Sequence, residues 1–359
     1  MNTKNGSLIF ELGHPKHYHM FKSFMHHYEN EGKNIVVIAR NKDVLLKLLE
    51  ADGVRYRTLG PYKNGLLNKL LITPLLILNY LKIVMQTRPS VIFSKASPYA
   101  SVFSKILGIR HIIFPDSDGF KSNDILMKFA DTIITPDNYK NDYGSKHRRI
   151  SGFFENIYLH PDIFKPDISV LKKYSIDPES KYVIIRFVGW GAHHDNLAKG
   201  ISNLDREKII KSLNKYADVY VTSEFQLNGN LSKHKLKIAP EDIHHVLYFS
   251  SLYFGDSQTM ATEASLLGVP AIRTNTFVGE SDMTNFKLLE NEYGLLFNYS
   301  DVNQAVSKAL ELLQDDEVKT KWKEKRERYY KSNRDVFKQI VEIVGEFNTD
   351  NLNRKKPYS

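Results

Sequence analysis

The hydrophobic positions in the first part of the chain form short apolar runs that alternate with amphipathic stretches. The runs are rich in β-branched side chains and almost continuously apolar, which is typical of parallel strands buried on both faces. We expect strands at 7–12, 34–39, 90–94, 111–114 and 131–135. The stretches between them have helical periodicity and predict helices at 18–31, 43–51, 97–107 and 122–129. Strands and helices in alternation predict an α/β fold.

The same alternation starts again after a proline-flanked linker at 161–166. A second series of strands and helices is expected at 182–187, 204–216, 218–223, 244–250, 252–255 and 271–273. A charged helical run then continues to about residue 347. Two doubly wound domains facing across a cleft explain this order best. The expected domain limits are 1–163 and 164–347, and the terminal helix is expected to belong to the second domain. Residues 348–359 are expected to form a disordered tail.

Length and composition restrict the class of protein. A chain of 359 residues can form two domains, each with its own core. Its 42% hydrophobic and 25% charged residues are ordinary for a globular protein and exclude disorder as the main state. The chain contains no cysteine. This absence excludes a disulfide framework, a cysteine-ligated zinc or iron–sulfur site and a thiol nucleophile.

The net charge of +9 is concentrated in the first half of the chain. Residues 1–165 contain 23 basic and 14 acidic side chains, whereas residues 166–359 contain 27 of each. The first half is therefore expected either to face an anionic partner or to have a solvated basic surface. Phosphorylated substrates and acidic membranes fit such a surface. Nucleic acid is disfavoured, because the chain lacks both a known binding module and interleaved aromatic and basic residues.

The most apolar stretch of the chain, 66–85, is not expected to cross a membrane. A membrane span needs about 20 largely uncharged residues, and this stretch is interrupted by Lys69, Pro74 and Lys82. The apolar run at 7–12 is too short for the core of a secretory signal. We therefore expect a cytoplasmic protein. The stretch 66–85 is either a core helix or an amphipathic helix that rests on the inner face of the plasma membrane.

The stretch 252–280 contains a candidate anion site. A polar turn follows the predicted strand and is made of Asp256, Ser257, Gln258 and Thr259. A helix begins directly after this turn, so free backbone N–H groups and the positive end of the helix dipole would meet a ligand there. Glu263 lies on the second helical turn, within reach of a ribose whose phosphates bind the turn. An ordinary N-capped helix is the alternative interpretation.

This turn resembles the nucleotide-sugar loop of enzymes with the GT-B fold. It is especially similar to the Asp-Ser-Gly-Gly…Glu element of the UDP-N-acetylglucosamine 2-epimerases. In that family the serine and the following backbone amides hold the diphosphate, and the glutamate holds the ribose. The resemblance assigns these roles to Ser257 and Glu263. Gln258 and Thr259 stand where the family has its two glycines, which puts the close approach of the backbone in doubt.

Three more motifs extend the resemblance over nearly the whole chain up to about residue 315. They lie at 13–22 (GHPKHYHMFK), 186–195 (RFVGWGAHHD) and 270–280 (PAIRTNTFVGE). Together with 255–263 they resemble the signatures of a bacterial and archaeal GT-B-like family that is described only as a domain of unknown function. This resemblance implies a GT-B fold, with two Rossmann-like domains facing across a cleft and a C-terminal helix. It implies the chemistry only by class.

The loop after the first strand is rich in histidine. His14, His17 and His19 lie within six residues, and Lys16 adds a positive charge. A histidine has a pKa near working pH, so one of the three could act as the general base on an acceptor hydroxyl. In GT-B transferases the similar loop borders the acceptor and the transferred sugar. Structural roles and zinc binding are the alternatives; the rigid Pro15 and the lack of a nearby carboxylate argue against a metal.

Other candidate site residues follow other strands. The resemblance places 189–195 where the epimerases have a phosphate loop, which makes Gly189, Gly191, His193 and His194 candidate contacts of the diphosphate. The backbone near His245 would frame the base, although a buried structural histidine is the alternative. Asp116 and Asp118 follow an apolar strand and are the acidic candidates for acid–base chemistry, or else cap the next turn.

These features together favour a metal-independent glycosyltransferase that uses a UDP-sugar as donor and no further cofactor. The acceptor would be a glycan or a polyprenyl-linked glycan in the synthesis of surface polysaccharide or glycoconjugate. The alternative is a UDP-sugar 2-epimerase or hydrolase of the same fold, with Asp116 and Asp118 as its acid–base pair. A module that senses nucleotides or binds nucleic acid is the third, disfavoured class.

Overall fold

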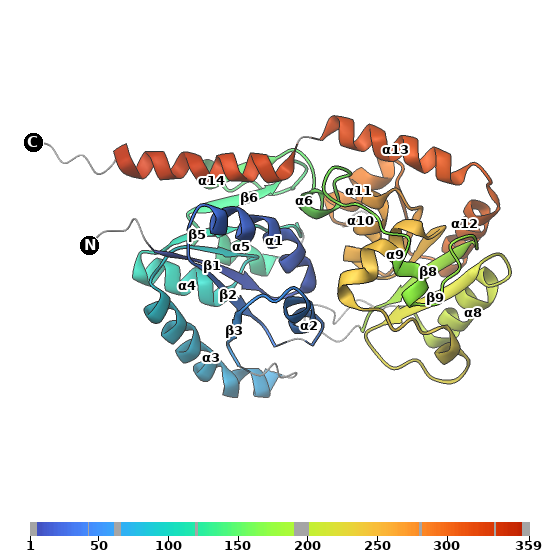
Figure 1. Ribbon diagram of the computed structural model, residues 1–359, viewed down its shortest axis with the longest axis horizontal. Coiled ribbons are helices and arrows are strands. Elements are labelled where there is room, and N and C mark those ends of the chain that lie inside the picture. The colour runs from blue at the N-terminus through green and yellow to red at the C-terminus, as the bar shows by residue number, and fades with distance from the viewer. Residues whose placement is uncertain are drawn as a thin grey trace, which may run out of the picture. The chain divides into compact units, whose positions relative to one another are not determined.

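The chain forms two compact units. The computed structural model describes residues 6–41, 43–60, 66–118, 121–189, 201–279, 282–333 and 335–353. The N-terminal unit contains Met1–Tyr158 together with Arg334–Ser359, and the C-terminal unit contains Leu159–Asn333. Each unit consists of one sheet and the helices that cover it (Figure 1).

The N-terminal unit is built on a seven-stranded parallel sheet in the order β3-β2-β1-β4-β5-β6-β7. The strands are β1 (Ser7–Leu12), β2 (Ile35–Ala39), β3 (Tyr56–Thr58), β4 (Pro89–Ser94), β5 (Arg110–Ile113), β6 (Thr132–Pro136) and β7 (His147–Ile150). The five predicted strands are confirmed. The sequence did not indicate β3 and β7, because both are short and contain charged residues.

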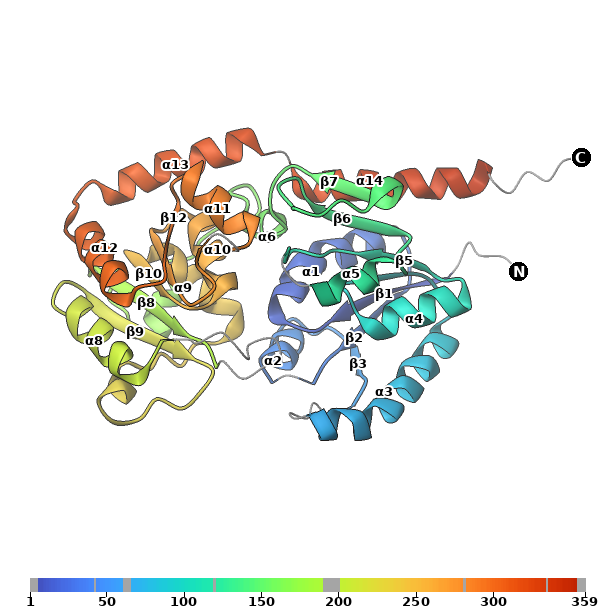
Figure 2. The same ribbon diagram turned by 180° about the vertical axis from the view of Figure 1, so that it is seen from behind.

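Helices cover both faces of this sheet. They are α1 (Pro15–Asn30), α2 (Asp43–Ala51), α3 (Leu66–Thr87), α4 (Pro98–Leu107), α5 (Lys121–Met127), α6 (Asn156–Leu159) and α14 (Val336–Asn353), with the 3₁₀ turn η2 (Gly144–Lys146). Side chains alternate between the faces of a strand. Phe10 therefore joins the core under α1, α2 and α14, whereas Ile9 joins the core under α3 and α4 (Figure 2).

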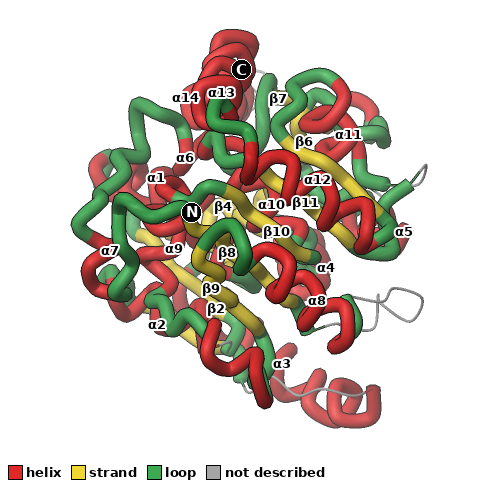
Figure 3. The backbone as a smooth tube through the Cα atoms, turned by 90° about the vertical axis from the view of Figure 1, so that its right-hand side faces the viewer, coloured by secondary structure: helices red, strands yellow, loops and turns green. Residues whose placement is uncertain are grey.

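The C-terminal unit has a smaller parallel sheet in the order β12-β11-β10-β8-β9. Figure 3 shows β11, β10, β8 and β9 of this sheet. Its strands are β8 (Tyr182–Phe187), β9 (Asp218–Ser223), β10 (Leu252–Gly255), β11 (Ala271–Thr274) and β12 (Leu296–Tyr299). Its helices are α7 (Val170–Lys173), α8 (Asn203–Leu213), η3 (Gly229–His234), η4 (Pro240–Asp242), α9 (Ile243–Phe249), α10 (Gln258–Leu267), α11 (Thr284–Asn291), α12 (Val302–Gln314) and α13 (Val318–Ser332). The predicted restart of the α/β pattern is confirmed.

The C-terminal helix does not belong to the unit in which the sequence placed it. Val336, Ile340 and Val344 on α14 are buried in the core of the N-terminal unit, and the Phe337 ring lies 4.8 Å from that of Phe24. The sequence showed that α14 has an apolar stripe, but it did not show which core this stripe covers. The prediction of disorder from residue 348 is also wrong up to Asn353, where α14 ends.

The apolar stretch predicted at 66–85 forms α3, which packs Tyr80, Ile83 and Val84 into the core of the N-terminal unit. Pro74 lies inside this helix. None of the helices in the described ranges combines the length and the hydrophobicity that a membrane crossing requires.

Gly255 provides a test of how closely the strands of the C-terminal sheet approach one another. A Cβ at this position would lie 2.4 Å from the carbonyl oxygen of Arg186 on β8. We expect Gly255→Ala to lower the free energy of unfolding by about 2 kcal/mol, because the overlap is with backbone that must move. Urea denaturation of the purified protein measures this change.

Gly345→Ala is the matched control, because a Cβ there meets nothing within 4 Å. Gly345 lies inside α14, where alanine is favoured over glycine by up to about 1 kcal/mol. We expect this variant to be at least as stable as the wild type. Equal stability of both variants would contradict the close contact at Gly255.

Candidate functional site

The N-terminus of α10 lies at the carboxyl end of β10, as the sequence predicted. Ser257 is the N-cap, and its Oγ accepts a hydrogen bond of 3.4 Å from the backbone N–H of Met260. Gln258 and Thr259 occupy the first helical turn and are half-buried. The backbone N–H groups that begin the helix point toward the edge of the sheet, where ligands of such sheets bind.

Asp256 connects this turn to the neighbouring strand. Its carboxylate is buried and accepts a hydrogen bond of 2.8 Å from the backbone N–H of Val188, directly after β8. Its own backbone N–H donates to the carbonyl of Arg186 at 3.3 Å. Asp256 therefore positions the turn through backbone contacts. The candidate role of its side chain at a diphosphate stays a prediction.

Glu263 makes a buried contact with a histidine on the second turn of α10. Its Oε1 lies 3.2 Å from Nε2 of His244, and both side chains are almost fully buried. His244 comes from α9, which packs against α10. The sequence analysis selected the neighbouring His245. No sequence signal distinguishes two adjacent histidines, and the helical phase of α9 decides which of them faces α10.

His245 points elsewhere. Its Nδ1 accepts a hydrogen bond of 3.0 Å from the backbone N–H of Asp167, and its ring lies 5.0 Å from that of Phe164. Burial lowers the pKa of His245. These contacts hold the segment before α7 against α9, so the structure gives the side chain of His245 a structural role.

The glycine-rich loop after β8 is described only at its beginning. The backbone N–H of Gly189 donates to Oε2 of Glu224 at 3.2 Å, and Oε1 of Glu224 pairs with Arg186 at 2.9 Å. Gly189 is therefore tied to the end of β9. The other candidates in this loop, Gly191, His193 and His194, lie outside the described residues.

In the N-terminal unit the three predicted histidines have different surroundings. The exposed His14 caps α1, and its Nδ1 accepts from the backbone N–H of Lys16 at 3.2 Å. The ring of His19 stacks on Tyr158 at a centroid distance of 5.3 Å. Only the rings of His14 and His17 are neighbours, 6.1 Å apart. In the described part of the chain, no group of three or more potential ligands is arranged to hold a metal ion.

His17 is arranged as a hydrogen-bond donor. Its Nδ1 accepts from the backbone N–H of Gly13 at 3.0 Å. A neutral imidazole that accepts at Nδ1 carries its proton on Nε2. Burial and the nearby charge of Lys95 hold the pKa of His17 well below its usual value. The lone pair that a general base needs is therefore already engaged, so His17 is poorly suited to the predicted role.

Four charged side chains lie together at the carboxyl ends of β1, β4 and β5. They are Lys16, Lys95, Asp116 and Glu155, which we call the charged cluster. Nζ of Lys16 lies 2.6 Å from both Asp116 and Glu155, and Nζ of Lys95 lies 2.9 Å from Asp116. Lys95 and Glu155 are each only 5% exposed. Two cations and two anions neutralise one another.

The charged cluster shifts the protonation of its members. Burial disfavours the charge of Asp116, but Lys16 and Lys95 outweigh it and hold the pKa of that carboxyl well below its usual range. Burial also opposes the charge of Lys16, yet Asp116 and Glu155 raise the pKa of its amine. At Lys95 burial prevails and lowers the pKa to about 8. The charged cluster thus contains a fixed carboxylate beside an amine that can exchange its proton near physiological pH.

The sequence indicated only part of this cluster. Asp116 was an acid–base candidate, and the charge of Lys16 was noted. Lys95 follows a predicted strand but was given no catalytic role, and Glu155 was not singled out. The position of Lys95 directly after β4 was the available signal. Glu155 follows β7, which the sequence did not indicate, so nothing marked that carboxylate as a site residue.

Backbone conformation holds Lys95 in place. The next residue, Ala96, has a φ of 64°, a left-handed conformation that costs a non-glycine residue about 1 kcal/mol. Ser94 Oγ lies 2.8 Å from Nε2 of the buried His111, whose pKa burial lowers to about 3. Ser97 then caps α4 by accepting from the backbone N–H of Ala100 at 3.3 Å. Strain of this kind is often retained at functional sites.

Asp118 connects two segments of the N-terminal unit. It is buried, and its Oδ2 accepts from the backbone N–H of Lys140 at 3.1 Å, while the hydroxyl of Tyr139 donates to the carbonyl of Ser117 at 3.2 Å. These contacts join the segment after β5 to the loop before β7. These contacts give Asp118 a positioning role, and an acid–base pair of Asp116 and Asp118 stays a prediction.

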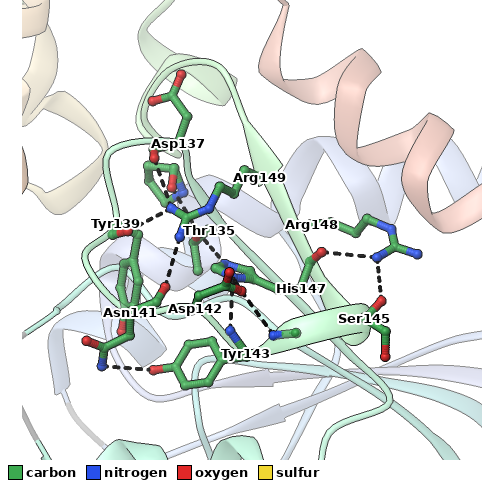
Figure 4. Close-up of polar contacts among 12 residues, drawn as sticks. Thr135, Asp137, Tyr139, Asn141, Asp142, Tyr143, Ser145, His147, Arg148 and Arg149 are labelled. Atoms are coloured by element: carbon green, nitrogen blue, oxygen red, sulfur yellow. Dashed lines mark hydrogen bonds and ion pairs between the residues drawn. The ribbon is translucent and has the colours of Figure 1, made fainter.

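Arg149 holds that loop (Figure 4). Its Nη1 donates to the carbonyls of Asp137 and Tyr139 at 2.9 and 2.7 Å, and its Nη2 donates to that of Asn141 at 3.0 Å. At the base of this loop, His147 Nε2 on β7 lies 2.8 Å from the hydroxyl of Thr135 on β6. Arg149 on β7 thus acts through the loop on the segment that carries Asp116.

The two sheets, their strand order and the α10 turn define a protein of the GT-B fold, and solved structures agree. The chain is similar to S. aureus MnaA in a co-structure with UDP, at 13% identity and a TM-score of 0.68 over 99% of both chains. The UDP-GlcNAc 2-epimerase from Neisseria meningitidis bound to UDP-GlcNAc matches at 14% identity and 0.69 over 95% of this chain and 100% of that one. The spinosyn forosaminyltransferase SpnP matches at 12% identity and 0.64 over 96% and 99%.

The family is shown by the sequence. A family model described as "Protein of unknown function (DUF354)" matches residues 8–349, and the chain belongs to that family. The uncharacterised protein MJ0665 of Methanocaldococcus jannaschii is 24% identical over 284 residues, which is 75% of this chain and 81% of that protein. The resemblance stated from the sequence motifs is confirmed.

The charged cluster can be tested through the pH dependence of stability. We expect Asp116→Asn to lower the free energy of unfolding by about 3 kcal/mol at pH 7, because two buried lysines lose their shared anion. The pKa of Asp116 is lower in the folded protein than in the unfolded chain. Its contribution is therefore present above about pH 4 and is lost as the pH falls. The difference between variant and wild type should shrink by about 1 kcal/mol between about pH 5 and pH 3.

Urea denaturation at several pH values measures this difference. Asp316→Asn is the control, because Asp316 is exposed and pairs with Lys181 at 3.4 Å only on the surface. This variant should stay within about 0.5 kcal/mol of the wild type at every pH. A constant effect of Asp116→Asn across the pH range would show that its carboxylate is not held ionised by the lysines.

Proposed function

We propose that this protein is a glycosyltransferase that takes a sugar from a nucleoside diphosphate sugar, with UDP as the expected nucleotide. One observation carries the proposal: the serine-capped N-terminus of α10 follows β10 at the carboxyl edge of the sheet, with buried Glu263 on the next turn. Backbone N–H groups and the hydroxyls of Ser257 and Thr259 suit a diphosphate. The carboxylate of Glu263 suits the hydroxyls of a ribose.

This binding mode needs no metal. The positive end of the α10 dipole and the N–H groups of its first turn neutralise part of the diphosphate charge. They would also stabilise the charge that develops on the leaving group. The expected donor site therefore functions without a divalent cation, and a chelator should leave turnover unchanged.

In the same proposal, the N-terminal unit provides the acceptor-side chemistry. Asp116 is held ionised by Lys16 and Lys95, so its carboxylate can orient an acceptor hydroxyl by accepting a hydrogen bond from it. The neutral form of the neighbouring Lys95 amine, whose pKa is about 8, can take the proton of that hydroxyl. Nε2–H of His17 can donate a hydrogen bond nearby. A direct displacement with inversion is the simplest reaction for this set. The acceptor class that we propose is a glycan or a polyprenyl-linked glycan in surface polysaccharide or glycoconjugate synthesis.

A second function, epimerisation or hydrolysis of a UDP-sugar, is favoured by a different observation. The amine of Lys95, with a pKa of about 8, lies 2.9 Å from the carboxylate of Asp116. Such a pair can move a proton to and from a sugar carbon or oxygen. In this alternative the acid–base partners are Lys95 and Asp116 instead of the two aspartates expected from the sequence.

Nucleotide binding is tested by thermal unfolding with a panel of nucleotides and nucleotide sugars. A ligand present at about 100 times its Kd stabilises the folded state by about 2.7 kcal/mol. We expect UDP or a UDP-sugar to raise the Tm by several degrees. Glu263→Gln keeps the shape of the side chain but removes its charge, and we expect roughly ten-fold weaker nucleotide binding, as for the loss of one charged hydrogen bond.

The control for Glu263→Gln is Glu311→Gln. Glu311 is exposed on α12 and pairs with Lys308 one turn away. The control should bind nucleotide as the wild type does, and both variants should retain the wild-type circular dichroism spectrum. If no nucleotide diphosphate shifts the Tm of the wild type, the proposed donor site is wrong. If Glu263→Gln binds normally, the ribose role of Glu263 is wrong.

Turnover distinguishes the two functions. We expect release of UDP from a UDP-sugar to be slow in water and to rise at least ten-fold when a matching glycan or polyprenyl-linked acceptor is added, because transfer needs the acceptor as nucleophile. The reaction is followed by UDP release and by mass spectrometry of the sugar products. Rapid formation of an epimer or of free sugar without acceptor would instead establish the alternative.

A further inference from the structure

The outer side of α3 is apolar where a surface helix normally carries polar residues. Exposed positions recur at helical spacing at Leu71, Leu75, Leu78, Lys82 and Met85, and Leu71 and Leu78 are 80% and 63% exposed. The inner side of the same helix contributes to the core of the N-terminal unit. A helix that is apolar on both sides is expected to be covered on both sides, so the exposed stripe calls for a second apolar environment.

The two following helices continue this surface. Ile106 on α4 is 70% exposed and Ile125 on α5 is 61% exposed, and α4 contacts both α3 and α5. Strand residues that point to these helices lie on one side of the sheet. Ile92 lies under α3 and α4, and Ile113 lies under α5 on the same face, because its partner Ser94 is two residues from Ile92. All three helices therefore cover the same face (Figure 2).

We call the exposed apolar side chains of α3, α4 and the end of α5 the docking face. It consists of Leu71, Leu75, Ile77, Leu78, Met85, Val102, Ile106, Leu107, Ile125 and Phe129. These ten belong to the fifteen large hydrophobic side chains that are exposed in the described part of the chain. Such a concentration on one side of one unit marks an interaction surface and not scattered surface residues.

The docking face is bordered by positive charge. Lys82 on α3, Lys105 on α4 and Lys128 after α5 are exposed among the apolar positions. The segment 53–115, which contains α3 and α4, has nine Lys+Arg and no Asp or Glu. This segment alone accounts for a charge equal to the +9 of the whole chain. The occupant of the docking face is therefore expected to be apolar within and anionic at its surface.

We propose that the docking face binds the surface of an anionic lipid bilayer. Leu and Ile side chains would enter the boundary between headgroups and acyl chains, and the three lysines would reach the phosphates with their alkyl stems along the apolar surface. A second copy of this chain is the less suitable occupant, because two basic faces would repel each other. The binding is peripheral, since α3 packs its inner side against its own unit.

The position of this face has a consequence that rests on the proposed function. Helix α4 begins at Pro98, directly after the loop that carries Lys95 of the charged cluster, and α5 begins shortly after Asp116. The N-termini of both helices therefore lie at the edge of the sheet where the charged cluster is found. A protein docked by α3, α4 and α5 would hold this edge near the membrane, within reach of a lipid-linked acceptor.

Vesicle flotation with the full-length protein tests the docking face. The vesicles contain phosphatidylcholine alone or phosphatidylcholine with phosphatidylglycerol. We expect binding to the anionic vesicles only, and its loss near 1 M salt, where the Debye length is about 3 Å. The triple variant Lys82→Glu, Lys105→Glu and Lys128→Glu should bind about 100-fold more weakly, at roughly five-fold for each basic charge lost.

Apolar contact is tested separately by Leu71→Ser, Leu78→Ser and Ile106→Ser combined, which we expect to bind at least roughly ten-fold more weakly. Both triple variants have matched controls on exposed positions of the C-terminal unit. These are Lys215→Glu, Lys237→Glu and Lys319→Glu for charge, and Ile163→Ser, Ile168→Ser and Leu204→Ser for the apolar side chains. Both controls should bind vesicles as the wild type does.

Three outcomes would overturn the proposal: no vesicle binding by the wild type, equal binding to neutral and anionic vesicles, or unchanged binding of both docking-face variants. A dimer that the apolar variant dissociates, seen by light scattering in the absence of vesicle binding, would identify a second copy as the occupant. All variants are checked by circular dichroism. Since none alters a proposed site residue, flotation can succeed or fail independently of the nucleotide-binding and turnover experiments.

Discussion

The constraint on which the N-terminal unit depends is the burial of four charges at the end of its sheet. Lys16 and Lys95 are stable there only because Asp116 and Glu155 neutralise them at hydrogen-bond distances. Removing one charge from such a group leaves another buried without compensation. The left-handed conformation of Ala96 and the loop held by Arg149 serve this arrangement, since they fix the backbone from which the charged side chains project.

The C-terminal unit obtains the positive potential of its candidate site in a different way. At its candidate site the positive potential comes from the N–H groups and the dipole at the start of α10, while Glu263 lies 3.2 Å from His244 inside the unit. This fits the charge distribution along the chain, in which residues 159–333 contain 23 basic and 24 acidic side chains. The excess charge lies instead in 53–115, which contributes Lys82 and Lys105 to the border of the docking face. In the proposed function, the nucleotide is thus bound largely without net protein charge, and the basic side chains are available for a membrane.

The sequence predicted most of the fold because parallel strands that are buried on both faces must be apolar throughout. Helices of eight or more residues between such strands can be predicted equally well, because their apolar positions recur at helical spacing. The predictions failed where the amino-acid composition of a segment does not show whether, or against which core, the segment is buried. Strand β7, with the sequence HRRI, is held by pairing with β6 and by the contacts of Arg149. The apolar stripe of α14 gave no indication that the chain returns to the N-terminal unit to bury Ile340.

By itself, the sequence determined the α/β class, the restart that separates the units, the α10 turn and the family. Each of these depends on residues close together in the chain, where periodicity, capping and spacing act directly. Only the tertiary structure decided that Lys95 and Glu155 join Asp116, and that His244 and not His245 meets Glu263. These outcomes depend on which residues from distant segments come together in one buried site of low dielectric. Burial and neighbouring charges set the protonation of the groups in such a site. The local sequence does not specify which distant residues meet there.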